Sequence, residues 1–397
     1  MAAAFFNSKS TSKSVQPYYK MSSTMQDNDT SQSRLPKPDK IVYFEAYSRG
    51  HAVPEKTGAI FVFGDSSSEK VALLCAGYPD DHNNFLPFGE KLASCCNGIM
   101  VGVMCLPGYD DRPEDGVGWE THPIEGFRLD EWTRAVGAAA KTLVGLSTYT
   151  KGKPEFIGIF HDWGCVPGTE WAQQVEHESD DGAAVVKPDK LVYLDVLLGP
   201  PKSAKDDPLS MDAIQKPTLS AILYILYQPL NAISSAIYTH VSKSFGMASF
   251  LFNWFSLELL RIAPVYPWDR SGVGLGLGSR AFFESKNATY KDLSRMVYMT
   301  FSYRRIFTDY LFKGKPIANL HEDWKKVPIL YLYGMNKRAS YHNPVSYALL
   351  EREFKEKRSL SNALGIADAG HWLYHQKEEE CLEHIASFVE AENTFRD

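Results

Sequence analysis

The sequence predicts an α/β fold with a mostly parallel sheet, helices on both sides of the sheet, and an inserted helical cap. In the parts of the chain before and after the cap, strand-type apolar runs alternate with helical segments, an order typical of parallel strands joined by helices. Residues 200–323 break this alternation with a helical, aromatic-rich block. The stretch from Pro154 to Gly168 is a third indication, because an apolar run stops there abruptly and a helical segment follows.

This pattern divides the 397 residues into four parts. Residues 1–40 are rich in Ser, Thr and Lys and contain no acidic residue before Asp27, which predicts a disordered tail or, alternatively, an organellar transit peptide. Residues 41–199 and 324–397 are expected to form two parts of one core, and residues 200–323 the cap. The expected location is cytoplasmic, or organellar if the tail is a transit peptide.

Each core element follows from its local pattern. Apolar runs between Gly-containing turns predict strands. The expected strands are Ile41–Tyr47, Ala59–Phe63, Val71–Cys75, Ile99–Cys105, Phe156–Phe160, Leu191–Val196, Val327–Tyr333 and Ala363–Ile366. Apolar residues at helical spacing predict the segments between them. The expected helices are Phe85–Ser94, Asp130–Leu146, Cys165–Gln174, Tyr347–Phe354 and Glu378–Glu390.

The cap contains a long stretch without charge, since no Asp, Glu, Lys or Arg occurs between Lys216 and Lys243. A membrane span needs about 20 apolar residues, and Pro229 interrupts this run. Two interpretations stay open: apolar packing within the cap, or a cap face that contacts a membrane peripherally and takes substrate from it. The aromatic residues of the cap predict a small lipophilic substrate, for which a cap over the strand ends would form a pocket wall.

The net charge and the cysteine content bear on nucleic-acid partners and metal sites. The formal net charge of -6 gives no reason to expect a nucleic-acid partner. The six cysteines form no CxxC pair and lie mostly in apolar runs, which predicts buried reduced thiols instead of disulfides or metal sites. We therefore expect no metal and no organic cofactor.

Two short motifs carry the functional argument. A buried strand that breaks sharply into a helix is the setting of a nucleophile elbow, and here His161-Asp162-Trp163-Gly164 stands at that break. Taken alone, Asp162 could equally be a helix N-cap. The second motif, Gly370-His371-Trp372, follows the last expected strand, where a hydrolase of this architecture keeps its base.

With these motifs the sequence resembles the α/β-hydrolase superfamily, and within it the Asp-nucleophile branch of epoxide hydrolases and haloalkane dehalogenases. The resemblance covers roughly Ala59 to Leu198 and Val327 to Val389, and the cap only weakly. It implies that Asp162 is the nucleophile, which forms an ester with the substrate, and that His371 activates the water that hydrolyses this ester.

The family pattern also implies an oxyanion hole and a third catalytic side chain. The backbone amides of Trp163 and Tyr78 would form the oxyanion hole, although Ala76 stands where the family usually has His. Many relatives place the acid where this chain has Lys337, a cation that could not orient an imidazole. Some dehalogenases use an acid at the end of the strand after the elbow helix, which here is Asp195. We expect Asp195 to orient His371; the alternative is a strand-end residue bonded to a neighbouring turn.

The resemblance predicts hydrolysis of a lipophilic epoxide to a vicinal diol. Relatives donate a proton to the alkoxide from two cap tyrosines, and Tyr224 and Tyr303 match best by order, with simple packing as the alternative for each. A haloalkane dehalogenase would hold its halide between Trp163 and a second donor, often Asn, at the position of Tyr78. The Tyr at that position favours epoxides.

A bulky residue near the elbow keeps a non-catalytic interpretation open. Two positions before the nucleophile the family has a small residue, because the elbow is crowded, and here Phe160 stands there. Either a neighbour makes room for the ring, or the scaffold has lost turnover. In the second case the protein would bind a hydrophobic ligand or a partner protein through its cap.

Overall fold

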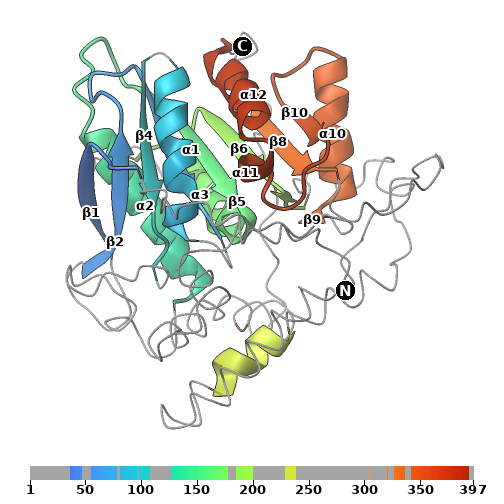
Figure 1. Cartoon of the computed structure of the whole chain (residues 1–397), viewed down its shortest axis with the longest axis horizontal. Helices are drawn as coiled ribbons and strands as arrows, with labels where there is room; N and C mark the ends of the chain where they lie inside the picture. Colours follow the sequence, from blue (N-terminus) through green and yellow to red (C-terminus); the bar gives the residue numbers. More distant parts are fainter. Residues whose placement is uncertain are drawn as a thin grey trace, which may run out of the picture.

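The computed structural model describes residues 36–46, 55–77, 81–96, 98–107, 127–177, 185–199, 229–237, 304, 320, 326–335 and 341–392. Within these residues the chain forms an eight-stranded sheet in the order β1-β2-β4-β3-β5-β6-β8-β10 (Figure 1). Helices α1 and α12 cover one face of the sheet, and α2 and α3 cover the other (Figure 1). The predicted mostly parallel sheet with flanking helices is confirmed.

The strands agree closely with the sequence pattern. They are β1 (Lys40–Ala46), β2 (Glu55–Phe63), β3 (Lys70–Cys75), β4 (Ile99–Met104), β5 (Glu155–His161), β6 (Lys190–Leu194), β8 (Ile329–Gly334) and β10 (Asn362–Ile366). β2 runs antiparallel to both neighbours, β1 and β4, whereas the other strand pairs of this sheet are parallel. Parallel pairing brings the carboxyl ends of β3, β5, β6 and β8 to one edge, where ligands of such sheets bind.

The helices also agree with the pattern, and two short elements were not predicted. The helices are α1 (His82–Cys95), α2 (Leu129–Gly145), α3 (Cys165–His177), α10 (Pro344–Lys355), α11 (Leu373–Gln376) and α12 (Glu378–Glu390), with a 3-10 turn η3 (Asp162–Gly164). The turn η3 and helix α11 are the unpredicted helical elements: η3 lies within the first functional motif, and α11 begins directly after the second.

One predicted strand was wrong in its extent. The expected strand Leu191–Val196 is interrupted: β6 ends at Leu194, and the short β7 (Val196–Leu197) pairs instead with β9 (Tyr341–His342) in a second, two-stranded sheet. Asp195 lies between them with a φ of 65°. Because this left-handed conformation cannot continue an extended strand, the chain turns at that residue.

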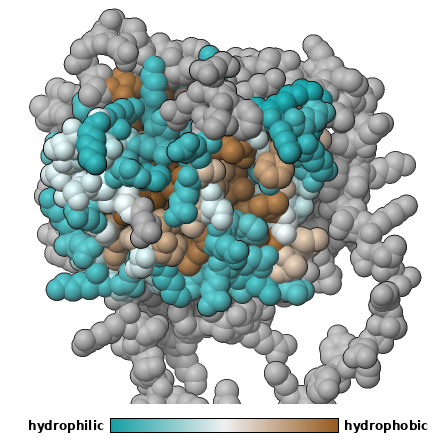
Figure 2. All heavy atoms as spheres, turned by 90° about the horizontal axis from the view of Figure 1, so that it is seen from above, coloured by the Kyte–Doolittle hydropathy of each residue, from teal (hydrophilic) through white to brown (hydrophobic). Residues whose placement is uncertain are grey.

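The hydrophobic core follows the sheet. Every residue of β3 from Val71 to Cys75, every residue of β4, and every residue of β5 after its first is buried. Seen from above the view of Figure 1, hydrophilic side chains surround a central hydrophobic area (Figure 2). Strands buried on both faces explain why they read in the sequence as continuous apolar runs.

Residues 1–35 of the proposed tail and most of the predicted cap lie outside the described residues. Within the cap region, residues 229–237 are helical, and Ile233 of this helix is exposed. Among the described residues, no helix has the length and apolar character needed to cross a membrane.

Candidate functional site

The elbow predicted around Asp162 is a strained turn between β5 and α3. β5 ends at His161, and η3 begins at Asp162 with a φ of 50°. A non-glycine residue in this left-handed region is uncommon and persists only where the surrounding structure holds it, which occurs most often at functional sites. The turn places the Asp162 side chain at the carboxyl edge of the sheet.

Two glycines allow the end of β3 to approach this turn. A Cβ atom on Gly164 would lie 2.6 Å from the carbonyl oxygen of Cys75, and one on Gly77 would lie 2.1 Å from the backbone nitrogen of Trp163. Both distances are too short for any real side chain, so only glycine fits. The segment after β3 therefore passes directly beside the amide that follows Asp162. The other predicted oxyanion residue, Tyr78, lies outside the described residues.

The loop that carries His371 is fixed at three points. The amide of Gly370 donates a hydrogen bond of 2.6 Å to Oε1 of Gln376. A Cβ atom on Gly334 would lie 2.1 Å from the carbonyl oxygen of Gly370, so the end of β8 contacts this loop backbone to backbone. The carbonyl oxygen of His371 accepts a hydrogen bond of 3.1 Å from Nε2 of His161. The position of His371 is thus set by its backbone, independently of any substrate.

The imidazole of His371 lies between two carboxylates. Its Nδ1 forms a hydrogen bond with Oδ2 of Asp195, and its Nε2 lies 3.6 Å from Oδ1 of Asp162. All three side chains are buried. A carboxylate on Nδ1 fixes the proton there and leaves Nε2 able to accept one. The distance of 3.6 Å is longer than a normal hydrogen bond but within the range of an ion pair when the imidazole is protonated.

Asp195 reaches His371 because the chain turns at the end of β6. Its amide donates a hydrogen bond of 2.8 Å to the carbonyl oxygen of Leu332, which anchors the turn to the neighbouring β8. The left-handed backbone then directs the carboxylate to the imidazole. Lys337, which stands at the alternative position for the acid, lies outside the described residues, as do Tyr224 and Tyr303.

His161 is a site residue that the sequence analysis missed. Its ring is fully buried, with its centroid 4.6 Å from that of His371, 4.8 Å from that of Tyr374 and 5.9 Å from that of Phe85. Because its partner is a carbonyl oxygen, Nε2 must carry the proton. The sequence feature that could have identified His161 is its place at the end of a fully apolar run. A polar side chain buried there needs a hydrogen-bond partner, which suggests a structural role beside the elbow.

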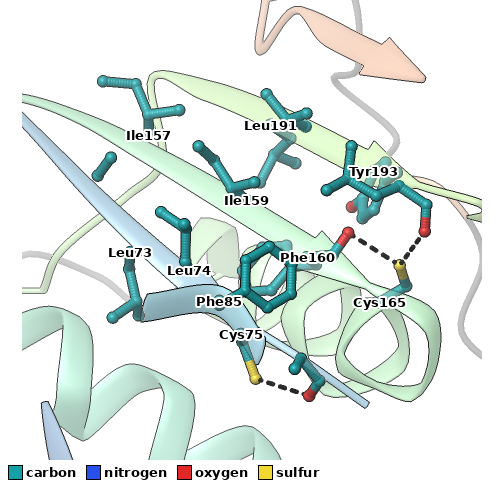
Figure 3. Packing of buried hydrophobic residues seen from close by; sticks show 14 of the residues in the cluster. Leu73, Leu74, Cys75, Phe85, Ile157, Ile159, Phe160, Cys165, Leu191 and Tyr193 are labelled. Atoms are coloured by element: carbon teal, nitrogen blue, oxygen red, sulfur yellow. Dashed lines mark hydrogen bonds between the residues drawn. The ribbon is translucent and has the colours of Figure 1, made fainter. Parts of the chain in front are cut away.

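The ring of Phe160 is accommodated by two glycines. A Cβ atom on Gly158 would lie 2.6 Å from Cε2 of the ring, and one on Gly168 would lie 2.6 Å from Cδ1. The small residues that the crowded elbow requires are therefore supplied by positions around Phe160 instead of by Phe160 itself. Figure 3 shows Phe160 among buried hydrophobic side chains of the sheet. This packing favours the first interpretation of Phe160, in which its neighbours make room.

Cys165 lies just behind the elbow and bridges two strand ends. Its Sγ donates to the carbonyl oxygen of Phe160 at 3.3 Å and lies 4.0 Å from that of Leu194 (Figure 3). Complete burial, and secondarily the negative charge of Asp162, raises the pKa of this thiol well above its usual value. A thiol that stays protonated is a poor nucleophile. Cys165 is therefore a poor candidate for a nucleophile.

The strand order, the elbow and the histidine loop define the class of the protein: it has the α/β-hydrolase fold. No protein-family model matches the chain, and no curated protein matches it. Similar solved structures include a laboratory-evolved variant of potato epoxide hydrolase, which is 14% identical with a TM-score of 0.46, over 88% of this chain and 99% of that chain.

Two further similar structures carry other names. A loop variant of a haloalkane dehalogenase from Bradyrhizobium elkanii is 12% identical with a TM-score of 0.49, over 88% of this chain and 96% of that chain. A putative acyltransferase from Salmonella enterica is 14% identical with a TM-score of 0.46, over 84% of this chain and 90% of that chain. Similarity at 12–14% identity concerns the fold alone. The reaction of a protein with this fold depends on the side chains at its site.

Proposed function

We propose that the protein is a hydrolase that opens a lipophilic epoxide to a vicinal diol through a covalent ester on Asp162. The observation that carries this proposal is the position of the His371 imidazole, between Asp162 and Asp195. An ionised carboxylate at the elbow needs no base in order to attack carbon, whereas the resulting ester needs one in order to be hydrolysed. The arrangement supplies one nucleophile and one oriented base.

In the first step, an oxygen of Asp162 forms a bond to an epoxide carbon, and the bond from that carbon to the epoxide oxygen breaks. The alkoxide takes a proton from a donor in the cap, for which Tyr224 and Tyr303 are the candidates. The product of this step is an alkyl ester of Asp162, which is stable until water is activated beside it.

In the second step, Nε2 of His371 removes a proton from water, and the water oxygen attacks the carbonyl carbon of the ester. Negative charge develops on the ester oxygen, where the amides of Trp163 and Tyr78 are proposed to donate hydrogen bonds. When this intermediate collapses, the bond between the carbonyl carbon and the ester oxygen breaks, and the departing alkoxide takes the proton from the His371 imidazolium. The new carboxylic acid of Asp162 returns its proton to the deprotonated cap donor, which leaves the diol, the carboxylate and the neutral donor. Asp195 holds the imidazole in the required tautomer and stabilises it while it is protonated.

Trapping of the ester tests the proposal. His371→Gln incubated with a lipophilic epoxide should accumulate one covalent adduct per chain, and peptide mapping should place it on Asp162. Asp162→Asn under the same conditions should give no adduct. In the wild type, one turnover in heavy-oxygen water should leave one heavy oxygen in the Asp162 carboxyl group, because water attacks the ester carbonyl. Label that appears only in the diol would contradict the ester route.

Haloalkane dehalogenation is the second candidate, favoured by the buried indole of Trp163 directly after the nucleophile. The same trapping variant offered a chloroalkane would then form the adduct and release halide, which an ion assay detects. If neither an epoxide nor a haloalkane yields an adduct, the non-catalytic alternative is supported. In that case Asp162→Asn should leave the affinity for a hydrophobic ligand unchanged.

A further inference from the structure

Two adjacent cysteines lie at the end of α1 that is remote from the candidate active site. Cys95 is the last residue of α1, and Cys96 is its C-cap. α1 begins just after the loop that follows β3, and a helix of 14 residues is about 21 Å long. The cysteine pair is therefore separated from the elbow by most of the length of this helix.

The geometry of the pair is unusual among the cysteines of the chain. The Sγ atoms of Cys95 and Cys96 are 3.8 Å apart, which is direct contact between sulfurs. Cys95 is exposed and Cys96 is buried, so a reagent can reach the first thiol from solvent and then meet the second. The remaining four cysteines are all buried: Cys75, Cys105, Cys165 and Cys381.

We propose that Cys95 and Cys96 form a dithiol site that binds a monosubstituted trivalent arsenical through both sulfurs. An arsenical of the form R–As(OH)₂ forms two As–S bonds and loses both hydroxyl groups. Each thiol proton leaves with a hydroxyl group as water, so two waters are released and no atom changes its oxidation state. The organic group R remains as the third substituent of arsenic.

The number of ligands among the described residues is too small for a structural zinc site. A structural zinc ion takes four protein ligands. Among the side chains that the structure describes, no group of three or more His, Cys, Asp or Glu residues could hold a metal ion. A substituted arsenic centre brings its own third substituent and requires only two sulfurs from the protein, which is what this site offers.

The spacing also favours a bridging atom over a disulfide. A disulfide needs sulfurs about 2.05 Å apart and Cα atoms about 4.4–6.8 Å apart, whereas adjacent Cα atoms are only about 3.8 Å apart. Direct oxidation would therefore strain the helix end, while insertion of arsenic leaves the sulfurs near their present separation. Burial, with a smaller contribution from Cys95, raises the pKa of Cys96 to about 12. The raised pKa makes the free thiolate of Cys96 scarce. It does not prevent the thiol from replacing a hydroxyl group on arsenic, because the thiol proton leaves with that hydroxyl group as water.

Phenylarsine oxide, which hydrates to an R–As(OH)₂ species, is the probe for this site. The full-length native chain should take up one phenylarsenic group with the loss of two thiol hydrogens, as seen by intact mass. Because the second bond forms within the same molecule, removal of either thiol should weaken binding about 100- to 10,000-fold. Cys95→Ser and Cys96→Ser test this loss, and Cys381→Ser is the matched control that should bind like the wild type.

Three results would overturn the proposal: no adduct on the wild type, an adduct mapped to the other cysteines, or undiminished affinity in Cys95→Ser. Circular dichroism establishes whether each variant is folded. Since Cys96 is buried and Cys95 is exposed, Cys95→Ser decides the question if Cys96→Ser does not fold. A small dithiol should displace the arsenical from the wild type, and a monothiol at the same concentration should not.

Discussion

At the residue scale, the contact between Asp195 and His371 supports Asp195 as the acid of the proposed mechanism. Asp195→Asn keeps the size of the side chain and removes the charge that would stabilise a protonated imidazole. We expect ester formation to change little and ester hydrolysis to slow by about 100- to 10,000-fold, the range of general-base effects. Rapid-quench measurement of the adduct during one turnover separates the two steps.

Lys337→Ala is the control for this assignment, because Lys337 occupies the position of the acid in many relatives. Its ester hydrolysis should match that of the wild type. An equal loss in both variants would contradict the choice of Asp195.

The packing of Phe160 leads to a second prediction at this scale. Gly168→Ala would place a methyl group 2.6 Å from the Phe160 ring. Such overpacking typically lowers the free energy of unfolding by about 1–3 kcal/mol. Chemical denaturation should show this loss, and the added variant Phe160→Leu should recover part of it because the smaller side chain leaves room.

Gly145→Ala is the matched control, since a Cβ atom on Gly145, also within a helix, would meet nothing within 4 Å. It should unfold at the same denaturant concentration as the wild type or a higher one, because alanine is the better helix former. Equal stability of Gly168→Ala and Gly145→Ala would show that the elbow is not tightly packed.

The site residues that could be predicted from the sequence are those that lie in short motifs next to the predicted strands. Asp162 and His371 each lie in a short motif at the end of a strand, so the pattern identified both. The contact between His161 and the carbonyl oxygen of His371 joins residues 210 positions apart, and no local pattern encodes it. The glycines that accommodate Phe160 were also visible in the sequence, but their role depends on the direction in which the ring points.

At the element scale, the buried side chain of Lys190 connects helix α12 to the sheet through hydrogen bonds. Nζ of Lys190, at the start of β6, donates to the carbonyl oxygens of Val389 and Ala391 at 2.7 and 2.8 Å, and lies 2.9 Å from Oε1 of Glu155. The carbonyl groups at the end of a helix have no partners within the helix itself. Lys190 therefore supplies the donors that the end of α12 needs.

Lys190→Met removes these donors and leaves Glu155 without its cation. Breaking one partner of a buried ion pair typically lowers stability by about 3–5 kcal/mol. Because Glu155 is partly exposed, we expect the lower end of this range, measured by thermal or chemical unfolding. Lys355→Met, which disrupts an exposed pair with Glu351, should change stability by less than about 1 kcal/mol. Similar losses in the two variants would show that Lys190 does not fasten α12.

The elements themselves were largely predictable, and the exceptions have a physical cause. Long apolar runs and helical spacing identified the strands and helices of the core, because burial on both faces leaves a strong pattern. The break at Asp195 was missed, since apolar residues resume directly after Asp195 while the backbone turns there. A positive φ at a non-glycine residue has no reliable sequence signature.

At the scale of the whole molecule, α12 contributes a large share of the core for its length. Five of its side chains are buried: Cys381, Leu382, Ile385, Phe388 and Val389. Burial of such side chains stabilises a fold by about 1.5–3 kcal/mol each. Their sum, on the order of 10 kcal/mol, is comparable to the whole free energy of unfolding of a typical domain.

A chain that ends after Gln376 should consequently lack a cooperative unfolding transition and be digested rapidly in limited proteolysis. A chain that ends after Glu392 keeps all of α12 and should unfold like the full-length protein. Cooperative unfolding of the shorter chain would show that the sheet folds without α12. Circular dichroism on both chains provides the measurement.

The separation in sequence between the turn that holds Asp162 and the loop that holds His371 has a consequence during synthesis of the chain. The ribosome completes Asp162 and Asp195 well before His371, which follows Asp195 by 176 positions. Until that loop contacts the end of β8, a nascent chain holds the proposed nucleophile without the base proposed to hydrolyse its ester. In the proposed chemistry, an epoxide that reacted with Asp162 at that stage would remain bound as an ester, because no base could activate water to hydrolyse it. The time between the synthesis of Asp162 and the docking of the His371 loop therefore sets how long the nascent chain is open to such modification.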